Sequence, residues 1–451
     1  MKTEYEKPTS AEATSKPSPE DHTRAEVWHG VKIYAFAGAM LLAAVVGLLF
    51  FLRPSVSESE KRELTKFPSL TWEALSSGEY FSQVTTWYAD TYPGREGLIH
   101  VNQWIHSLFG IRTVQIIPSL PEDPTTPEDP SDPGTSDDGP VDTTPIEKLG
   151  SVYVKGSTAY ELYKENSANS ARYAELIHQA ATLLGDKVQV YDIIVPLSSS
   201  VNLSQKELGR VGSSDAAAAI QSMYQKMEGV HTVNIYDTLR AHNSEYLYFR
   251  TDHHWTALGG YYAYVEFCHA AGMTPFPLST WQEYRFEGFL GTLYAEAGSP
   301  AQLGNTPDTV YAWVPNGTND IRITDKTGNT LRYRGGVVRT DTDTFYANAA
   351  SKYNCFIMGD NPLSEIHNES ITDGSSIAVV KESFGNALIP FLVDHYEYVY
   401  VIDYRYFPSA TGKTLSQFVQ EKNIPTVLFI NNLTATSATP RLNELAKLLA
   451  D

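Results

Sequence analysis

The alternation of apolar runs and polar stretches predicts an α/β body over residues 147–451. Val188–Val195 is a continuous apolar run that stops at Pro196, which is typical of a strand covered on both faces in a parallel sheet. Three later apolar runs each lead into a polar loop, over residues 377–381, 398–402 and 426–430. Helical periodicity occurs over residues 167–184, 216–227, 257–271 and 440–450. The pattern therefore predicts a parallel sheet covered by helices.

The middle of this body has a different pattern. Residues 274–350 are rich in Thr, Gly, Tyr and Asn and show few helical periods, so they predict a β-rich insertion of hairpins and loops. A short apolar stretch over residues 354–358 predicts one further strand, which ends before Asp360.

An uncharged apolar run of 20 residues, 33–52, lies between Lys32 and Arg53 near the start of the chain. As a helix it is about 30 Å long, the thickness of a bilayer core. The alternative is a cleaved signal peptide, but the apolar core of such a peptide is usually about 7–15 residues long. In addition, Phe51-Leu52-Arg53-Pro54 is a poor cleavage site. We therefore predict an uncleaved transmembrane signal anchor over residues 31–53.

The segments on either side of this run set the expected topology. Residues 1–30, rich in Pro, Ser, Thr and Glu, predict a disordered cytoplasmic tail. A single span near the N-terminus usually leaves the short tail inside, so we expect a single-pass membrane protein with an extracytoplasmic C-terminal domain. Apolar spacings of three and four residues predict a helical lead-in over residues 56–116, with a turn from Tyr88 to Arg95.

The acidic residues are concentrated in one segment. Lys and Arg number 34 and Asp and Glu 53, which gives a net charge of -19. Between Arg112 and Lys148 there is no cation, nine residues are acidic, and Pro recurs often. This composition predicts a disordered Pro/Asp-rich insertion over residues 117–146. The acidic balance argues against nucleic acid as a partner, because a phosphate backbone requires a basic surface.

The cysteine count is low. Cys268 and Cys355 are the two cysteines, which excludes a disulfide scaffold and a cysteine-based zinc module. Two buried free thiols are favoured over one disulfide.

Candidate chemistry begins at Asp252-His253-His254-Trp255, directly before a predicted helix. A histidine base needs an acceptor on its other nitrogen to fix its tautomer, and Asp252 is placed to serve His254 in this way. His253 is then expected to face elsewhere. Two alternatives stay open: Asp252 caps the helix while the histidines pack structurally, or the histidines bind a metal. The metal alternative is the weakest, since adjacent histidines diverge and no further ligand cluster has a convincing spacing.

A nucleophile is predicted at the end of a later strand. Ser383 lies between an apolar strand and a segment that opens a helix, so its hydroxyl is expected at the carboxyl edge of the sheet. Backbone N–H groups at this turn, including that of Gly385, and the side chain of Asn431 are candidate oxyanion donors. The alternative is that Ser383 only caps the helix. Arg405 either binds a polar substrate or pairs structurally with Asp403.

The Asp252–Trp255 string, the Lys381–Asn386 turn and the Tyr88–Arg95 turn together resemble the DHHW family of membrane-anchored or secreted bacterial proteins. That family looks related to the SGNH-hydrolase-like proteins that O-acetylate alginate. The resemblance covers roughly residues 60–451 apart from the acidic insertion, and it implies an SGNH-like fold.

For the site, the resemblance implies a triad in which Ser383 is the nucleophile, His254 the base and Asp252 its orienting acid. These families commonly have Asp before the nucleophile, whereas this chain has Glu382.

The resemblance also implies a function: an extracytoplasmic acyl-ester enzyme, with an O-acetyltransferase acting on a cell-surface or cell-wall polysaccharide as the leading expectation. No cofactor is implied, and an acyl donor from the cytoplasm would require a membrane partner protein. The alternatives are an acetylesterase on the same glycans and a non-catalytic surface protein that binds glycan. In each case Trp255, Trp281 and Trp313 are candidates for stacking on sugar rings.

Overall fold

The structure is a computed structural model. It describes residues 144–450 except 347, residues 114–117, and parts of 31–101, of which 79–95 is the longest continuous stretch. The chain divides into two compact units, residues 1–108 and 109–451. The second unit carries all the candidate chemistry.

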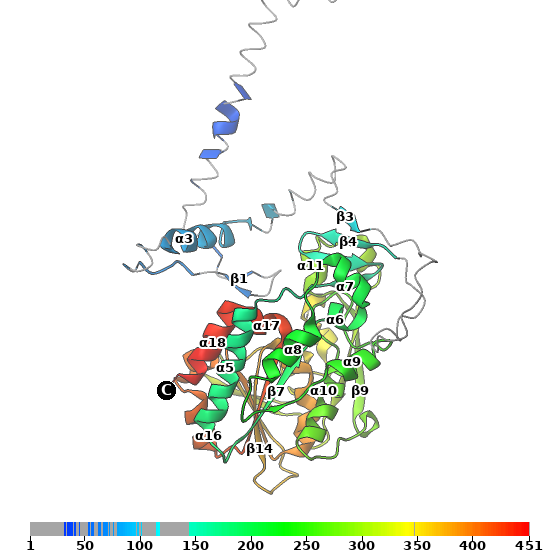
Figure 1. Cartoon of the computed structure of the whole chain (residues 1–451), viewed down its shortest axis with the longest axis vertical. Helices are drawn as coiled ribbons and strands as arrows, with labels where there is room; N and C mark the ends of the chain where they lie inside the picture. Colours follow the sequence, from blue (N-terminus) through cyan, green and yellow to red (C-terminus); the bar gives the residue numbers. More distant parts are fainter. Residues whose placement is uncertain are drawn as a thin grey trace, which may run out of the picture. The chain divides into compact units, whose positions relative to one another are not determined.

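An eight-stranded sheet forms the centre of the second unit (Figure 1). Its strands are β7 Gln189–Val195, β8 His231–Thr232, β11 Ile321–Thr324, β12 Thr330–Tyr333, β13 Leu363–His367, β14 Ser376–Lys381, β15 Tyr398–Asp403 and β16 Thr426–Asn432. Their spatial order is β12-β11-β13-β15-β14-β16-β7-β8. The five strands from β15 to β8 run parallel, and β13, β11 and β12 add antiparallel pairs at one edge.

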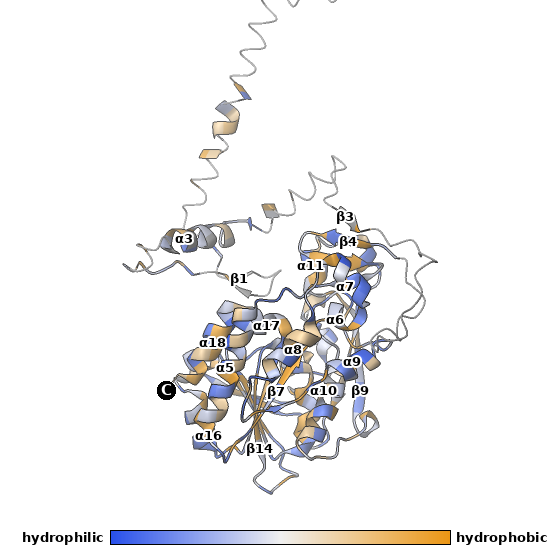
Figure 2. Ribbon diagram, viewed as in Figure 1, coloured by the Kyte–Doolittle hydropathy of each residue, from blue (hydrophilic) through white to orange (hydrophobic). Residues whose placement is uncertain are grey.

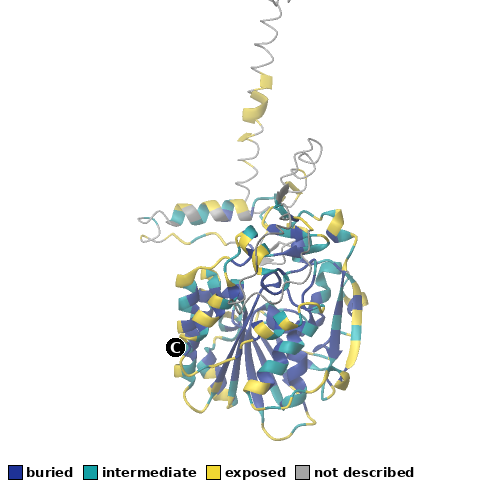
Figure 3. Cartoon of the chain, turned by 45° about the vertical axis from the view of Figure 1, so that its right-hand side comes forward, coloured by how far each residue is buried: buried dark blue, intermediate teal, exposed yellow. Residues whose placement is uncertain are grey.

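The parallel strands are buried on both faces. Along β14, Ile377 and Val379 pack into one hydrophobic cluster, while Ala378 and Val380 pack into the other. This alternation explains the continuous apolar runs in the sequence, because both faces of each strand need apolar side chains. Figure 2 shows strands of the central sheet in the hydrophobic colour, and Figure 3 shows them as the buried centre of the unit.

Helices cover one face of the sheet, and two helices with a hairpin cover the other. The first cluster of helices consists of α5 Ser167–Leu184, α8 Ala216–Tyr224, α16 Leu415–Lys422, α17 Leu433–Ser437 and α18 Thr439–Leu449. The opposite face is covered by α10 Ala257–Ala270, α14 Ile389–Leu392 and the antiparallel hairpin of β9 Gln282–Phe289 and β10 Asp308–Val314.

Shorter helices connect these elements. They are α6 Ser198–Asn202, α7 Gln205–Val211, α9 Tyr236–Ala241, α11 Thr292–Glu296, α12 Ala301–Gly304, α13 Thr342–Phe345, α15 Phe407–Thr411 and the 3-10 helices η2 Leu278–Thr280, η3 Ala349–Cys355, η4 Ser383–Ala387 and η5 Val393–His395.

A second, four-stranded antiparallel sheet is formed by β3 Val114–Ile117, β4 Ile146–Leu149, β5 Val152–Lys155 and β6 Thr158–Tyr160. Residues 114–116 are therefore in a strand, not in the helical lead-in predicted over 56–116. Ile117 pairs with Ile146, so the acidic segment connects two neighbouring strands. Residues 118–143, which make up most of the predicted disordered insertion, lie outside the described residues.

The first unit contains α3 Glu79–Asp90 and a pair of two-residue strands, β1 Val56–Ser57 and β2 Arg62–Glu63. The predicted tail over residues 1–30 and most of the predicted span over residues 31–53 lie outside the described residues. A helix with the length and apolar character needed to cross a membrane is absent from the part of the chain that is described.

Two predictions about the sheet are wrong. Residues 354–358 are not a strand: the segment is the end of η3 followed by a turn in which Ile357 and Met358 have φ of 47° and 58°. A short apolar run does not reveal its backbone conformation, because any buried segment needs apolar side chains. The sheet is also not wholly parallel, since β11 and β12 from the predicted β-rich insertion extend its antiparallel edge.

Candidate active site

The Asp252–Trp255 segment is held as a tight loop in front of α10. Tyr248 and Trp255 form an antiparallel bridge, and the Phe249 N–H donates to the His254 carbonyl at 3.2 Å. The buried carboxylate of Asp308, at the start of β10, accepts hydrogen bonds from the Thr251 N–H at 2.8 Å and the Thr251 hydroxyl at 2.6 Å. The β9–β10 hairpin thereby fixes the loop from one side.

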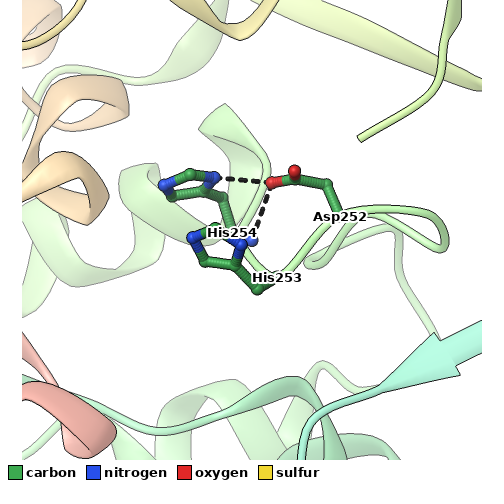
Figure 4. Close-up of side chains that lie close together, drawn as sticks. All are labelled: Asp252, His253 and His254. Carbon is green, nitrogen blue, oxygen red and sulfur yellow. Dashed lines mark hydrogen bonds and ion pairs between the residues drawn. The ribbon is translucent and has the colours of Figure 1, made fainter. Parts of the chain in front are cut away.

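Three predicted residues form a hydrogen-bonded row. The His254 Nε2 lies 2.8 Å from the Ser383 Oγ, and the His254 Nδ1 lies 2.5 Å from the Asp252 Oδ1 (Figure 4 shows the second pair). Asp252 and His254 are buried. The structure therefore brings together a hydroxyl, an imidazole and a carboxylate in the order that general-base activation of a serine requires.

Asp252 is in a site that favours its charged form. Its Oδ1 accepts from the His254 backbone N–H and ring, and its Oδ2 accepts from the Thr292 N–H at 2.8 Å and the Thr292 hydroxyl at 3.1 Å. Burial alone would raise the pKa of Asp252, but His254, His253 and these hydrogen bonds hold that pKa well below its ordinary range. An ionised carboxylate fixes the His254 proton on Nδ1 and leaves Nε2 free to accept.

Asp252 also depends on a glycine that the sequence reasoning did not identify. A Cβ on Gly291 would lie 2.2 Å from the Asp252 Cβ, so only glycine fits there. No local sequence pattern marks this position, because the close approach exists only in the folded chain.

Ser383 is the first residue of η4 and is separated from the end of β14 by one residue, as its sequence context predicts. Strand β14 lies between β15 and β16. The chain continues from β14 to its neighbour on one side, β15, and later to its neighbour on the other side, β16, so the order in which strands are added changes direction at β14. Ligand sites of open α/β sheets occur at such points. Among the residues that the structure describes, no acceptor for the Ser383 backbone N–H is found, and this donor remains available for an oxyanion.

Glu382 anchors the nucleophile turn. Its Oε1 accepts from the Asn432 N–H at 2.9 Å, and its Oε2 accepts from the Phe384 N–H at 3.2 Å and lies 3.2 Å from the Ser383 Oγ. The longer Glu side chain thus connects the turn to the end of β16 and caps η4. The sequence singled out this position only as a departure from the usual Asp.

Two aromatic residues connect the histidine and the serine. Tyr353 stacks on His254 with ring centroids 4.1 Å apart, and its hydroxyl donates to the Ser383 carbonyl at 2.9 Å. Trp255 was expected to contact substrate, but it is fully buried and its indole N–H donates to the Phe384 carbonyl at 2.7 Å. That expectation is wrong: the hydrogen bond of Trp255 connects the Asp252–Trp255 loop to the turn that carries Ser383. Trp281 is likewise buried, with its N–H on Asp394.

The predicted oxyanion donor Asn431 faces away from the serine. It is buried, and its Nδ2 donates to the Tyr173 hydroxyl at 3.1 Å. Successive residues of a strand point to opposite faces, so the next residue is the one on the serine side. Asn432 is that residue: its N–H contacts Glu382, its Oδ1 caps α17, and no described residue accepts from its Nδ2. Asn431 is therefore not placed to donate to an oxyanion at Ser383.

Two further predicted residues, Gly385 and Arg405, bond to other parts of the protein and not to a site for substrate. The Gly385 N–H donates to the Glu382 carbonyl at 3.0 Å, so it serves the turn and not an oxyanion. Arg405 donates through Nε to Asp403 at 2.8 Å and pairs with Asp360 at 2.8 Å. Lys381 joins both aspartates. Of the two alternatives for Arg405, the structure shows the internal ion pair.

His253 does not face elsewhere, contrary to expectation. Its ring lies against that of His254, with centroids 3.9 Å apart, and Figure 4 shows both rings on the same side of Asp252. Asp252, His253 and His254 can each offer one ligand atom within 4.8 Å of the others, which is close enough to hold a metal ion. However, Asp252 already accepts four hydrogen bonds, and a metal would have to replace several of them.

The fold and this row of residues define a mixed α/β protein with serine, histidine and aspartate at the carboxyl edge of its sheet. The chain belongs to the DHHW protein family, whose model matches residues 60–132 and 129–402. The resemblance carried by the Asp252–Trp255 string is thus confirmed.

Several solved structures are similar. A DHHW family protein from Eubacterium siraeum is 26% identical with a TM-score of 0.58, covering 68% of this chain and 96% of its own. Bacillus cereus PatB1, in a structure with a sulfonyl adduct, is 16% identical with a TM-score of 0.53, covering 64% and 98%. The O-acetyltransferase domain of Pseudomonas putida AlgJ is 13% identical, covers 65% and 96%, and has a TM-score of 0.36, too low to bear on the fold.

At this identity the likeness to PatB1 shows the fold alone. None of the curated proteins compared with the chain matches it.

Proposed function

We propose that this protein is a serine-dependent acyl-ester enzyme in which Ser383 is the nucleophile, His254 the general base and Asp252 the residue that orients the base. One observation carries the proposal: the Ser383 Oγ, His254 Nε2, His254 Nδ1 and Asp252 Oδ1 form a continuous row with separations of 2.8 and 2.5 Å. A serine that merely caps a helix has no need of a buried histidine with an ionised carboxylate behind it.

The reaction has two balanced steps. The Ser383 oxygen attacks the carbonyl carbon of an acyl donor, and the Ser383 proton passes to the His254 Nε2. The donor's leaving group departs with that proton and leaves an acyl ester on Ser383. An acceptor hydroxyl then gives its proton to His254 and attacks the ester, and Ser383 departs by taking the proton back. The oxyanion of each step is stabilised by the Ser383 N–H and, we infer, by the Asn432 Nδ2.

The acceptor distinguishes a transferase from an esterase. We propose an O-acetyltransferase that acts on a cell-surface or cell-wall polysaccharide, in keeping with the family's resemblance to alginate O-acetylating proteins. The predicted signal anchor over residues 31–53 would hold the enzyme at the outer side of the membrane. A cytoplasmic acetyl donor would then require a membrane partner. An esterase uses the same residues with water as the acceptor.

The test uses purified full-length protein in detergent with p-nitrophenyl acetate. Wild-type protein should release p-nitrophenol, and Ser383→Ala should lower that rate by at least about 10³-fold, as removal of a serine nucleophile does. Ser416→Ala on α16 is the matched control and should leave the rate unchanged. Equal rates in wild-type protein and Ser383→Ala would refute the proposal and leave the glycan-binding alternative.

A further inference from the structure

A second imidazole stands beside the first and has no part in the mechanism above. The His253 Nδ1 lies 2.5 Å from the Thr292 Oγ1, and the Thr292 hydroxyl lies 3.1 Å from the Asp252 Oδ2. Both histidines are therefore connected to the same carboxylate, His254 directly and His253 through Thr292. A histidine that only fills space would not need this connection.

The hydrogen bonds determine where the proton of His253 is. An ionised carboxylate can only accept, so the Thr292 hydroxyl donates to Asp252. The Thr292 oxygen can then only accept from His253, which places the ring proton on Nδ1. The His253 Nε2 is therefore an acceptor, as is the Nε2 of His254. Burial is the main cause that lowers the pKa of His253, which keeps the ring neutral at neutral pH.

The free nitrogen of His253 is directed to the same side as the free nitrogen of His254 (Figure 4). The two rings are 3.9 Å apart, and Figure 4 shows a nitrogen of each directed away from Asp252. Within the described part of the chain the His253 Nε2 has no hydrogen-bond partner, and the residue is half-buried. Two acceptor nitrogens thus lie side by side, and one of them, the His254 Nε2, is 2.8 Å from the Ser383 Oγ.

The charges around this pair favour a neutral ligand. The carboxylates of Glu161 and Glu382 act on His253, and Asp252 lies behind it. The nearby cations Lys381 and Arg405 are paired with Asp360 and Asp403. A ligand that offers hydroxyl donors suits this surface, whereas an anionic group would be repelled.

We propose that the His253 Nε2 accepts a hydrogen bond from a second hydroxyl of the acceptor, adjacent to the hydroxyl that attacks the acyl ester. This inference rests on the proposed function and specifies its substrate: an uncharged sugar unit with hydroxyls on neighbouring carbons. The second hydroxyl keeps its proton, so the chemistry of the two steps is unchanged. His253 selects the acceptor, and it favours a vicinal diol over water or a simple alcohol.

The experiment measures how the acyl-enzyme partitions between acceptors. Full-length protein in detergent is given p-nitrophenyl acetate with trans-1,2-cyclohexanediol or with cyclohexanol, and both acetylated alcohols are quantified. Wild-type protein should acetylate the diol about tenfold more than cyclohexanol, because one neutral hydrogen bond contributes about that factor. Because the diol has two hydroxyls and cyclohexanol has one, the number of hydroxyls alone would favour the diol by about a factor of two. In His253→Phe, which keeps a stacked ring, the preference should fall to about two.

Control variants separate the outcomes. His253→Gln, which retains an acceptor oxygen, should recover part of the preference. His242→Phe replaces another stacked histidine, on Tyr262, and should behave as wild type. A preference that His253→Phe leaves unchanged would overturn the inference, and so would an enzyme that transfers to neither alcohol. If His253→Phe abolishes p-nitrophenol release, His253 instead supports Asp252 and the inference is wrong. Release that does not depend on Ser383 refutes the proposed function itself.

Discussion

Replacing Asp252 by Asn tests the central hydrogen-bonded row with the smallest change of shape. Each oxygen of Asp252 accepts two hydrogen bonds, from His254 on one side and from Thr292 on the other. An amide nitrogen in either position therefore faces two donors. Turned toward His254, it forces the ring proton onto Nε2, and the ring can no longer accept the proton of Ser383. In either orientation the negative charge behind the ring is lost.

The size of the effect follows from the geometry. Asp252 and His254 are buried and in direct contact, so protonation of His254 creates a charge pair separated by about 4 Å. At an effective dielectric constant of about 20 this pair contributes about 4 kcal/mol, which is about a thousandfold in rate. The His254 molecules held in the wrong tautomer raise the expected loss in kcat to about 10³–10⁴-fold. A buried donor left unsatisfied also lowers the free energy of unfolding by about 1–3 kcal/mol.

The assay compares p-nitrophenyl acetate turnover by wild-type protein and Asp252→Asn, with urea denaturation to confirm that the variant is folded. Asp237→Asn, which removes an exposed carboxylate from α9, is the matched control and should lose no activity. A folded Asp252→Asn variant that retains kcat within tenfold of wild type would show that Asp252 does not fix the state of His254. The reasoning from the hydrogen bonds would then be refuted.

Three further predictions concern other parts of the second unit. Asn432→Ser, which keeps a cap for α17 but removes the Nδ2, should lower kcat by about 10²–10³-fold, whereas Asn431→Ala should mainly lower stability; equal effects on kcat would contradict the assignment. Burial raises the pKa of Asp192 to about 7, so the folded state keeps a proton that the unfolded chain releases near pH 4. The free energy of unfolding should therefore fall by up to about 4 kcal/mol between pH 4 and 8, and urea denaturation of Asp192→Asn should show a smaller fall. Replacing residues 118–143 by a two-residue turn should change the melting temperature little, because Ile117 already pairs with Ile146; a large loss would show that the acidic segment stabilises the fold.

The parallel part of the sheet was predictable because burial on both faces leaves a direct trace in the sequence. Strand β7 and helix α5 were predicted to within a residue or two, since apolar runs and apolar periodicity record how each element packs. The antiparallel edge was not predicted, because β11 and β12 are short and their partners are distant in the sequence. The left-handed turn at Ile357 and Met358 has no local signal either, as neither residue favours that conformation.

In the site, the grouping of Asp252, His254 and Ser383 could be predicted from the sequence, whereas the contacts that depend on packing could not. The spacing of Asp252 and His254 and the strand-to-turn position of Ser383 could be read from local sequence. Asn431 was chosen over Asn432 because the sequence does not show which face of the strand each residue occupies. Tyr353 was missed because its contacts to His254 and Ser383 are made only in the folded chain. Trp255 was assigned to substrate because a sequence does not show which aromatic rings are buried.

The most direct test of the account is whether Ser383 reacts as a nucleophile activated by His254. Full-length protein is treated with phenylmethanesulfonyl fluoride, which forms a stable ester with an activated serine, and the modified peptide is identified by mass spectrometry. We predict one sulfonyl group, on Ser383, and at least a hundredfold slower labelling in folded His254→Ala. Unmodified Ser383 in the wild-type protein, or labelling at an equal rate in His254→Ala, would contradict the account.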